Sequence, residues 1–437
     1  MKEMKSENSG TDFKYRHSNS GAWAPSKSAR PDHAAPDKKA TPATFADRLS
    51  RSFWGLNADA LCAEARKRTG LHDFGDPPLE PGLSILINSL EQQADLKPFG
   101  RFLMRTHLLG LLETRLRLTE AWKQKRNSLE AEPIRKPIFI VGMPRSGSTF
   151  LHELLAEDPR HRAPLAWEVM FPLADQAGDS KDEARRVRKA EFCLWCFRRL
   201  APQADEVYPM RGRTPHECVA IHSYTFLSEE FVSTCRVNDY ETFLHSTDLT
   251  PAYRWQKRFL QHLQSESQPR RWVLKSPDHV YGLEELFATF PDASIVQTHR
   301  NPLQVLKSSA DVTWVLRGLY GRPDDREAIR AREARVLADG TERFIQFRDA
   351  HPELASRFVD VKYTDIVADP VATVRRIYEQ LDHRLSDQAA QRMQALASRR
   401  TRYRGKRSSE EPSSKQDTTV ERNRFERYCV RFGLSSP

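Results

Sequence analysis

The segment with the clearest chemical content is Gly142-Met-Pro-Arg-Ser-Gly-Ser-Thr149. It follows the outline G-x-x-x-x-G-K-[ST] of a phosphate-binding loop, with an apolar strand predicted before it and a helix after it. Glycines let the backbone approach a phosphate, and N–H groups at the start of the helix stabilise its charge. The segment therefore predicts a phosphate-binding loop; the alternative is an ordinary strand–turn–helix corner.

Two departures from that outline decide which phosphate chemistry is expected. Ser148 replaces the Lys that reaches a γ-phosphate, and a cation stands three residues earlier, at Arg145. Later predicted strands end in Lys275 and in His299-Arg300, so none ends in an acidic residue suited to Mg²⁺. Because nucleoside triphosphatases need both that Lys and a metal, we expect a nucleotide bound by cations and hydrogen bonds, without metal.

Repeated strand–helix units must position these residues. Residues 136–159, 270–293, 294–312 and 357–381 each read as a short apolar strand followed by a helix. Such repeats favour a parallel sheet covered by helices on both faces. We therefore expect an α/β, P-loop-like three-layer fold with a central parallel sheet, plus an N-terminal helical region.

Composition divides the chain into three parts. Residues 1–45 have few large apolar side chains and are predicted to be a disordered basic tail. Residues 46–132 carry apolar residues at helical spacing and are predicted to form three or four helices. Residues 133–437 hold the strand–helix units, and their sheet is the expected partner for the apolar faces of those helices.

The segment Pro144–Thr149 resembles the 5′-phosphosulfate loop of sulfotransferases that use 3′-phosphoadenosine-5′-phosphosulfate (PAPS). The form with Arg in place of Lys is similar to the bacterial and tyrosyl-protein branches, and the resemblance runs from about residue 136 to residue 434. It implies that PAPS is the co-substrate and that no metal takes part. The residues that it implies for the 5′-phosphosulfate are Arg145, Ser146, Gly147, Ser148 and Thr149.

Three further segments match the family in order. Arg300 and Ser308, eight residues apart, correspond to the pair that binds the 3′-phosphate, for which a surface ion pair is the alternative reading of Arg300. Lys275 corresponds to the Lys beside the transferring sulfuryl group, where a cation stabilises developing charge. Gly405 and Lys406 lie in a segment similar to the late basic loop that closes over the 3′-phosphate, or else in a disordered basic stretch.

Two residues are candidates for the base that accepts the proton of the acceptor. Glu168 lies 23 residues after Arg145, as the Glu base does in tyrosyl-protein and heparan-type members; the alternative is a carboxylate at a helix start. His279 lies four residues after Lys275, whereas small-molecule members have a His two residues after that Lys, where this chain has Pro277. We expect Glu168 as the base, with His279 second, or as a group that orients the substrate. The alternative for His279 is a neighbour of a helix N-cap or a contact in the core.

The region between the loop and the second strand–helix unit is aromatic and partly basic. Family members build the acceptor pocket there, so its aromatic residues line either an apolar pocket or the ordinary core. The basic run 185–189 is expected to be a solvated helix face. The aromatic residues are Trp167, Phe171, Trp195, Phe197 and Tyr208.

Charge and apolar content limit the setting of the protein. The 437 residues include 69 Lys plus Arg against 59 Asp plus Glu, a net charge of +10 that favours anionic partners. Neither an apolar run of about 18 residues nor a signal-peptide core is present, so we expect no membrane span and no secretion. Six cysteines in a chain of 437 residues are too few for a fold held together by disulfides. This low content predicts a reducing, cytoplasmic setting. Nucleic acid is not an expected partner, because no reader motif is recognisable.

The resemblance implies an enzyme that moves the sulfuryl group of PAPS to a hydroxyl or amine by metal-free in-line displacement. The acceptor stays open among a lipid, a sterol-like or other hydrophobic alcohol, a carbohydrate and a peptide tyrosine. Oligomeric state is not readable from the sequence. The rivals are a nucleotide kinase, which needs the missing Lys and an acidic metal ligand, and a binding module that does no chemistry.

Overall fold

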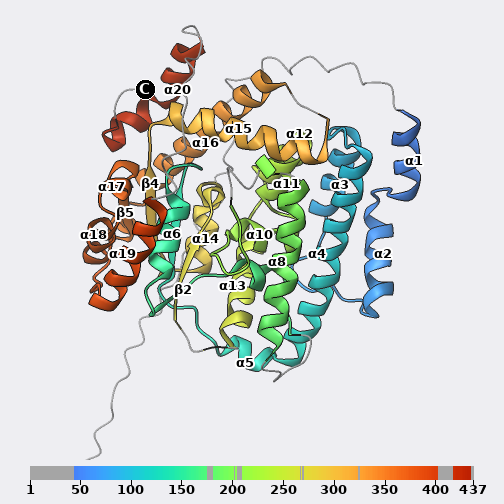
Figure 1. Ribbon diagram of the computed structural model, residues 1–437, viewed down its shortest axis with the longest axis horizontal. Helices are drawn as coiled ribbons and strands as arrows, with labels where there is room; N and C mark the ends of the chain where they lie inside the picture. Colours follow the sequence, from blue (N-terminus) through green and yellow to red (C-terminus); the bar gives the residue numbers. More distant parts are fainter. Residues whose placement is uncertain are drawn as a thin grey trace, which may run out of the picture. The chain divides into compact units, whose positions relative to one another are not determined.

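A five-stranded parallel sheet organises the protein (Figure 1). The computed structural model describes residues 44–174, 181–200, 202–203, 209–265, 267, 270–322, 325–401 and 417–434. The strand order is β2-β3-β1-β4-β5. The strands are β1 (Ile138–Gly142), β2 (His161–Arg162), β3 (Arg271–Lys275), β4 (Ser294–His299) and β5 (Phe358–Lys362).

The register of the strands brings the predicted chemistry to one edge of the sheet. β1 pairs in parallel with β3 on one side, where Ile140 is opposite Lys275, and with β4 on the other, where Gly142 is opposite Thr298. The carboxyl ends of all three strands therefore lie together. In open parallel sheets this edge is where ligands bind.

The two faces of the sheet are covered by different helices. Ile138 and Ile140 pack with α6 (Ser148–Ala156), α18 (Pro370–Gln380) and α19 (Asp387–Thr401). Phe139 and Val141, which point the other way because side chains alternate along a strand, share a core with helices from the N-terminal region. Figure 1 shows α18 and α19 to one side of the strands and α3 and α4 to the other.

The N-terminal helices share one core with this second face of the sheet. That core runs from Leu56 and Leu61 through Trp122 to Phe139 and Ile295. The described residues from Thr44 onward form one compact unit. The helices are α1 (Phe45–Phe53), α2 (Ala58–Thr69), α3 (Gly82–Gln92), α4 (Pro98–Gln124) and α5 (Arg126–Glu130).

The remaining elements lie between and after the strands. Between β2 and β3 these are α7 (Ala166–Met170), α8 (Asp182–Leu200), α10 (Cys218–His222), η1 (Ser223–Thr225), α11 (Glu229–Thr234), α12 (Asn238–Leu244) and α13 (Thr250–Ser265). After β3 they are η2 (Pro277–Tyr281), α14 (Leu283–Thr289), α15 (Pro302–Tyr320), α16 (Arg326–Ala350), η3 (Pro352–Arg357), α17 (Tyr363–Ala368) and α20 (Asp417–Phe432).

The predicted α/β architecture is confirmed, with all four predicted strands in a parallel sheet. β2 was not predicted, since two residues are too short to give a pattern. The predicted boundaries at residues 45 and 132 stay predictions, and the proposed tail lies almost wholly outside the described residues. Within the described part of the chain, every helix is too short or too polar to cross a membrane.

Candidate active site

The loop between β1 and α6 has a shape that depends on its two glycines. A Cβ on Gly142 would lie 2.5 Å from the backbone oxygen of Thr298, because β4 runs directly beside it. Gly147 has a φ of +89°, and a Cβ there would lie 2.9 Å from the ring of Tyr363. Both positions therefore require glycine.

The buried side chain of Ser146 bonds the phosphate-binding loop to the neighbouring strand. Its side chain is fully buried, and its hydroxyl donates to the carbonyl of Met143 at 2.5 Å. The same hydroxyl lies 2.6 Å from the hydroxyl of Thr298 on β4. The side chain of Ser146 thus holds the loop on the sheet.

The start of α6 is suited to an anion. The helix begins at Ser148, and its N-cap residue, Gly147, makes no side-chain capping hydrogen bond. The first-turn N–H groups of a helix have no partner within the helix, and the helix dipole favours negative charge there. With Arg145 in the same loop, this end of α6 fits a phosphate or sulfate group.

An arginine cluster, made of Arg145, Arg300 and Ser308, lies on the β4 side of the loop. Arg300 follows β4 and donates from Nη1 to the carbonyl of Arg145 at 2.9 Å. Its guanidinium lies 4.2 Å from the ring centre of Tyr363. Arg145 donates from Nε to the hydroxyl of Ser308 on α15 at 3.1 Å. The fold therefore brings together three of the predicted nucleotide-binding residues.

A lysine cluster, made of Lys275, Thr149 and Glu217, lies on the β3 side. The side chain of Lys275 is only 4% exposed, and its Nζ donates to the hydroxyl of Thr149 at 3.1 Å. The same Nζ forms an ion pair with the carboxylate of Glu217, which directly precedes α10. Sequence reasoning missed Glu217, because it lies in an irregular stretch far from any strand–helix pattern.

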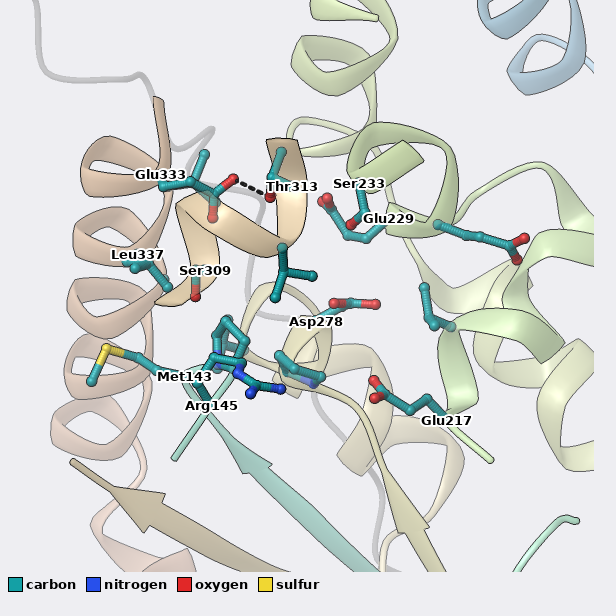
Figure 2. A pocket seen from close by; sticks show the side chains of 18 of the residues that line it. Met143, Arg145, Glu217, Glu229, Ser233, Asp278, Ser309, Thr313, Glu333 and Leu337 are labelled. Atoms are coloured by element: carbon teal, nitrogen blue, oxygen red, sulfur yellow. Dashed lines mark hydrogen bonds between the residues drawn. The ribbon is translucent and has the colours of Figure 1, made fainter. Parts of the chain in front are cut away.

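A cavity of about 390 Å³ opens from the lysine cluster. Gly142, Arg145, Thr149, Lys275 and Glu217 line it at the sheet edge. In Figure 2, Arg145, Asp278 and Glu217 surround the lower part of the cavity, and Glu333 and Glu229 lie in its upper part. The apolar part of the wall includes Val219, Ala220, Val280, Val312, Leu316, Val336, Leu337 and Phe344.

Three carboxylates in the cavity wall have basic partners. Glu229 pairs with His245, Glu230 lies 2.8 Å from Nε2 of His107, and Glu333 pairs with Arg332. Glu333 also accepts a hydrogen bond from the hydroxyl of Thr313 at 3.0 Å, drawn as a dashed line in Figure 2. Arg332, and the two histidines when they are protonated, offset part of the negative charge of the wall.

Asp278 is a partly buried carboxyl in the cavity wall. Burial, and then the negative charges of Glu229 and Glu217, raise the pKa of Asp278 well above its usual range. The hydroxyl of Ser276 lies 3.1 Å from Oδ2. A protonated carboxyl donates a hydrogen bond, so Asp278 is suited to hold the polar end of a ligand.

Glu168 lies outside the residues that line the cavity. One of its carboxylate oxygens accepts from Arg162 at 2.6 Å, and the other accepts from the backbone N–H of Leu165 at 2.9 Å. The second contact caps the N-terminus of α7. This geometry is that of a carboxylate at a helix start.

His279 points into the core beneath the cavity. Its Nδ1 lies 2.8 Å from the hydroxyl of Tyr253, and its ring meets Phe139 edge-on at 5.0 Å. Burial, and then the neighbouring His222, hold the pKa of His279 well below its usual range. This lowered pKa favours the neutral imidazole, but His279 is not among the residues that line the cavity.

The remaining predicted site residues divide into two groups. Ser148 is buried at the start of α6, and Thr149 is exposed beside it. Gly405 and Lys406 lie outside the described residues. Within the described part of the chain, no group of three or more His, Cys, Asp or Glu side chains is arranged to hold a metal ion.

A family model with the description "Sulfotransferase family" matches residues 137–387, more than half of the chain. The chain is 26% identical over 261 residues to the omega-hydroxy-beta-dihydromenaquinone-9 sulfotransferases Stf3 of Mycobacterium bovis and of Mycobacterium tuberculosis. Each match covers 56% of this chain and 62% of the relative, so it spans less than two thirds of the relative's length.

Two solved structures are similar over most of the chain. Sulfotransferase STF1 from Mycobacterium tuberculosis is 30% identical with a TM-score of 0.70, and the match covers 77% of this chain and 92% of that one. Sulfotransferase STF9 from Mycobacterium avium is 24% identical with a TM-score of 0.75, covering 87% and 97%. The second likeness concerns the fold alone.

Proposed function

Because the chain belongs to the sulfotransferase family, we propose that it moves the sulfuryl group of PAPS to a hydroxyl or amine of an apolar acceptor. The observation that carries this proposal is the lysine cluster at the sheet end of the cavity. There a buried cation, an exposed hydroxyl and a carboxylate meet between the phosphate-binding loop and an apolar chamber. PAPS supplies the sulfuryl group and leaves as adenosine 3′,5′-bisphosphate.

The donor nucleotide is held by the loop and the arginine cluster in this proposal. The loop from Arg145 to Thr149 and the uncapped start of α6 bind the 5′-phosphosulfate. Arg300 and Ser308 bind the 3′-phosphate, to which a guanidinium offers a fork of donors. Since Arg300 is already fixed by the carbonyl of Arg145 and the ring of Tyr363, little of its side-chain freedom is lost on binding.

Lys275 and Glu217 carry the transfer in this proposal. Lys275 stabilises the negative charge that develops on the leaving phosphate, and its burial strengthens that interaction. Glu217 accepts the proton of the acceptor, because a general base must lie within hydrogen-bond reach of the reacting hydroxyl. We prefer Glu217 to Glu168 and His279, since Glu217 lines the cavity and contacts Lys275.

The acceptor is proposed to be a lipid or another hydrophobic alcohol. The wall is largely apolar, and its charged groups are mostly paired. The curated relatives are named for a menaquinone derivative that carries a hydroxyl group. A cavity of about 390 Å³ accommodates a drug-sized group, so it would take the hydroxyl-bearing end of a longer molecule. Asp278 would donate a hydrogen bond to that end.

Calorimetric titration with adenosine 3′,5′-bisphosphate, and then with 5′-AMP, tests the proposal. We expect binding of the bisphosphate in the micromolar range, about −8 kcal/mol, and much weaker binding of 5′-AMP. Transfer of label from [35S]PAPS to a long-chain alcohol tests the chemistry. A preference for ATP with Mg²⁺ over the bisphosphate would overturn the proposal and favour a kinase.

A further inference from the structure

α8, drawn in green in Figure 1, is a 19-residue helix with an unusual outer face. Its inner face holds Asp182, Arg186, Ala190 and Leu194, which are buried. The guanidinium of Arg186 lies 4.7 Å from the ring centre of Trp167 on α7. These contacts fix which side of α8 faces solvent.

The outer face combines large apolar side chains with cations. Phe192 is 64% exposed and Trp195 is 51% exposed, and their rings stack with centres 6.1 Å apart. Arg188 lies four residues before Phe192, and Arg199 lies four residues after Trp195; both are exposed. Positions three and four apart share one helix face. The four side chains therefore form a single outward stripe, which we call the α8 stripe.

The same helix also takes part in the cavity wall. Phe197, on another side of α8, lines the cavity together with Met210. Arg198 donates to the carbonyl of Met210 at 3.2 Å, and Glu191 accepts from the N–H of Gly212 at 2.6 Å. α8 thus lies between the cavity and solvent, and the α8 stripe is on its outer side.

We propose that the α8 stripe contacts an anionic lipid bilayer, which brings the cavity to the membrane surface. A helix that lies in a membrane interface has aromatic and aliphatic residues on one side and Lys or Arg around them. Arginines near an anionic surface each add to the attraction. Of the basic run 185–189, Arg188 and Lys189 are exposed, whereas Arg186 is buried on the inner face, so only part of the run is the solvated face that the sequence predicts. The use of this contact, to load an acceptor from the bilayer, rests on the proposed function.

Charge complementarity is the reason for choosing a bilayer over a protein partner. Aromatic residues with arginine also occur in protein interfaces, so the choice rests on charge. The α8 stripe has an exposed arginine at each end of its aromatic pair and no acidic residue among its four side chains. The chain as a whole also carries a net charge of +10, which favours an anionic surface over a neutral one.

Sedimentation with vesicles tests this inference on the full chain. Vesicles of phosphatidylcholine and phosphatidylglycerol are compared with vesicles of phosphatidylcholine alone, at low and at high salt. We expect binding to the mixed vesicles that weakens with salt, and little binding to the neutral ones. Equal binding to both, or no binding to either, overturns the inference.

Two variants distinguish binding through the α8 stripe from non-specific binding through exposed apolar side chains elsewhere. Phe192→Ser with Trp195→Ser removes the aromatic pair, and we expect binding to the mixed vesicles to weaken about tenfold or more. The matched control is Phe45→Ser with Phe53→Ser on α1, where the two side chains are 74% and 70% exposed. The control is expected to bind the vesicles as the unaltered chain does; equal loss in both variants overturns the inference.

Nucleotide binding and oligomeric state complete the test of the α8 stripe. Binding of adenosine 3′,5′-bisphosphate is expected to be unchanged in both variants, which shows that they are folded. If the unaltered chain is a dimer that the stripe variant abolishes, and vesicles are not bound, the stripe is a protein interface and the inference fails. Vesicle binding needs no sulfuryl transfer, so its result does not depend on whether the proposed function holds.

Discussion

The two sides of the phosphate-binding loop are built differently. On the β4 side, the side chains of the arginine cluster are partly exposed, and they contact a backbone carbonyl, a hydroxyl and an aromatic ring. On the β3 side, the lysine cluster is an ion pair almost closed to solvent, with the cavity beside it. Both follow from the strand order, which sets β4 and β3 on opposite sides of β1.

This contrast suggests a division of labour between binding and transfer. Arginines with a fixed guanidinium plane recognise a phosphate that does not react. A buried lysine acts more strongly on charge that appears during a reaction, because little water screens it. If that division holds, variants on the β3 side will change turnover, and variants on the β4 side will change affinity for the nucleotide.

The largest effect is expected for Lys275→Ala. We expect turnover to fall by about 10²–10³-fold, the usual loss for a group that stabilises developing charge, with little change in bisphosphate affinity. Steady-state kinetics and calorimetry separate the two. The matched control is Lys257→Ala, whose amine contacts the carbonyl of Thr289 away from the cavity. A loss of affinity without a loss of turnover would reverse the proposed division.

Glu217→Gln tests the partner of that lysine. The amide keeps the shape of the side chain but cannot accept a proton, so we expect turnover to fall by about 100-fold, as for loss of a general base. Bisphosphate affinity is expected to stay within a few-fold. Full turnover in this variant would return the base to Glu168 or His279.

Arg300→Ala tests the other side of the loop. Loss of a charged hydrogen bond is expected to weaken binding of adenosine 3′,5′-bisphosphate by about 1–3 kcal/mol, while 5′-AMP binding changes little. Arg326→Ala, which removes an exposed arginine paired with Asp311, is the control. Equal losses for both nucleotides would mean that Arg300 does not recognise the 3′-phosphate.

The smallest effect on activity is expected for Glu168→Gln. Its carboxylate is nearly buried, pairs with Arg162 and caps α7, so the variant is expected to unfold more easily, by about 1–3 kcal/mol. Thermal unfolding measures this change. Turnover of the folded enzyme is expected to be unaffected, and a 100-fold loss with unchanged stability would restore Glu168 as the base.

The sequence predicted the parts of the site that sit at strand ends. Gly142, Lys275 and Arg300 each follow or end a short apolar run, and parallel strands bring such ends together whatever lies between them. The strand order, by contrast, depends on long crossovers that no local pattern records. The short β2 was missed because two residues are too few to give a pattern.

Glu217 and Glu168 show the limit of spacing arguments. Glu168 has the expected distance from Arg145 along the chain, but three residues after Leu165 it is placed to cap a helix. Glu217 contacts Lys275 from the position directly before α10, which belongs to no strand–helix unit. The signal available in the sequence was an acidic residue directly before a short apolar helix. This pattern is too common to identify Glu217 as a site residue.

The hydroxyl pair of Ser146 and Thr298 has a consequence for the thermodynamics of binding. The backbone of the loop is already held on β4 by these buried groups, so its conformational entropy is lost when the chain folds and not when a nucleotide arrives. Association with the bisphosphate then involves little folding of the protein. The heat-capacity change of binding is therefore expected to be small, since coupled folding is what makes it large.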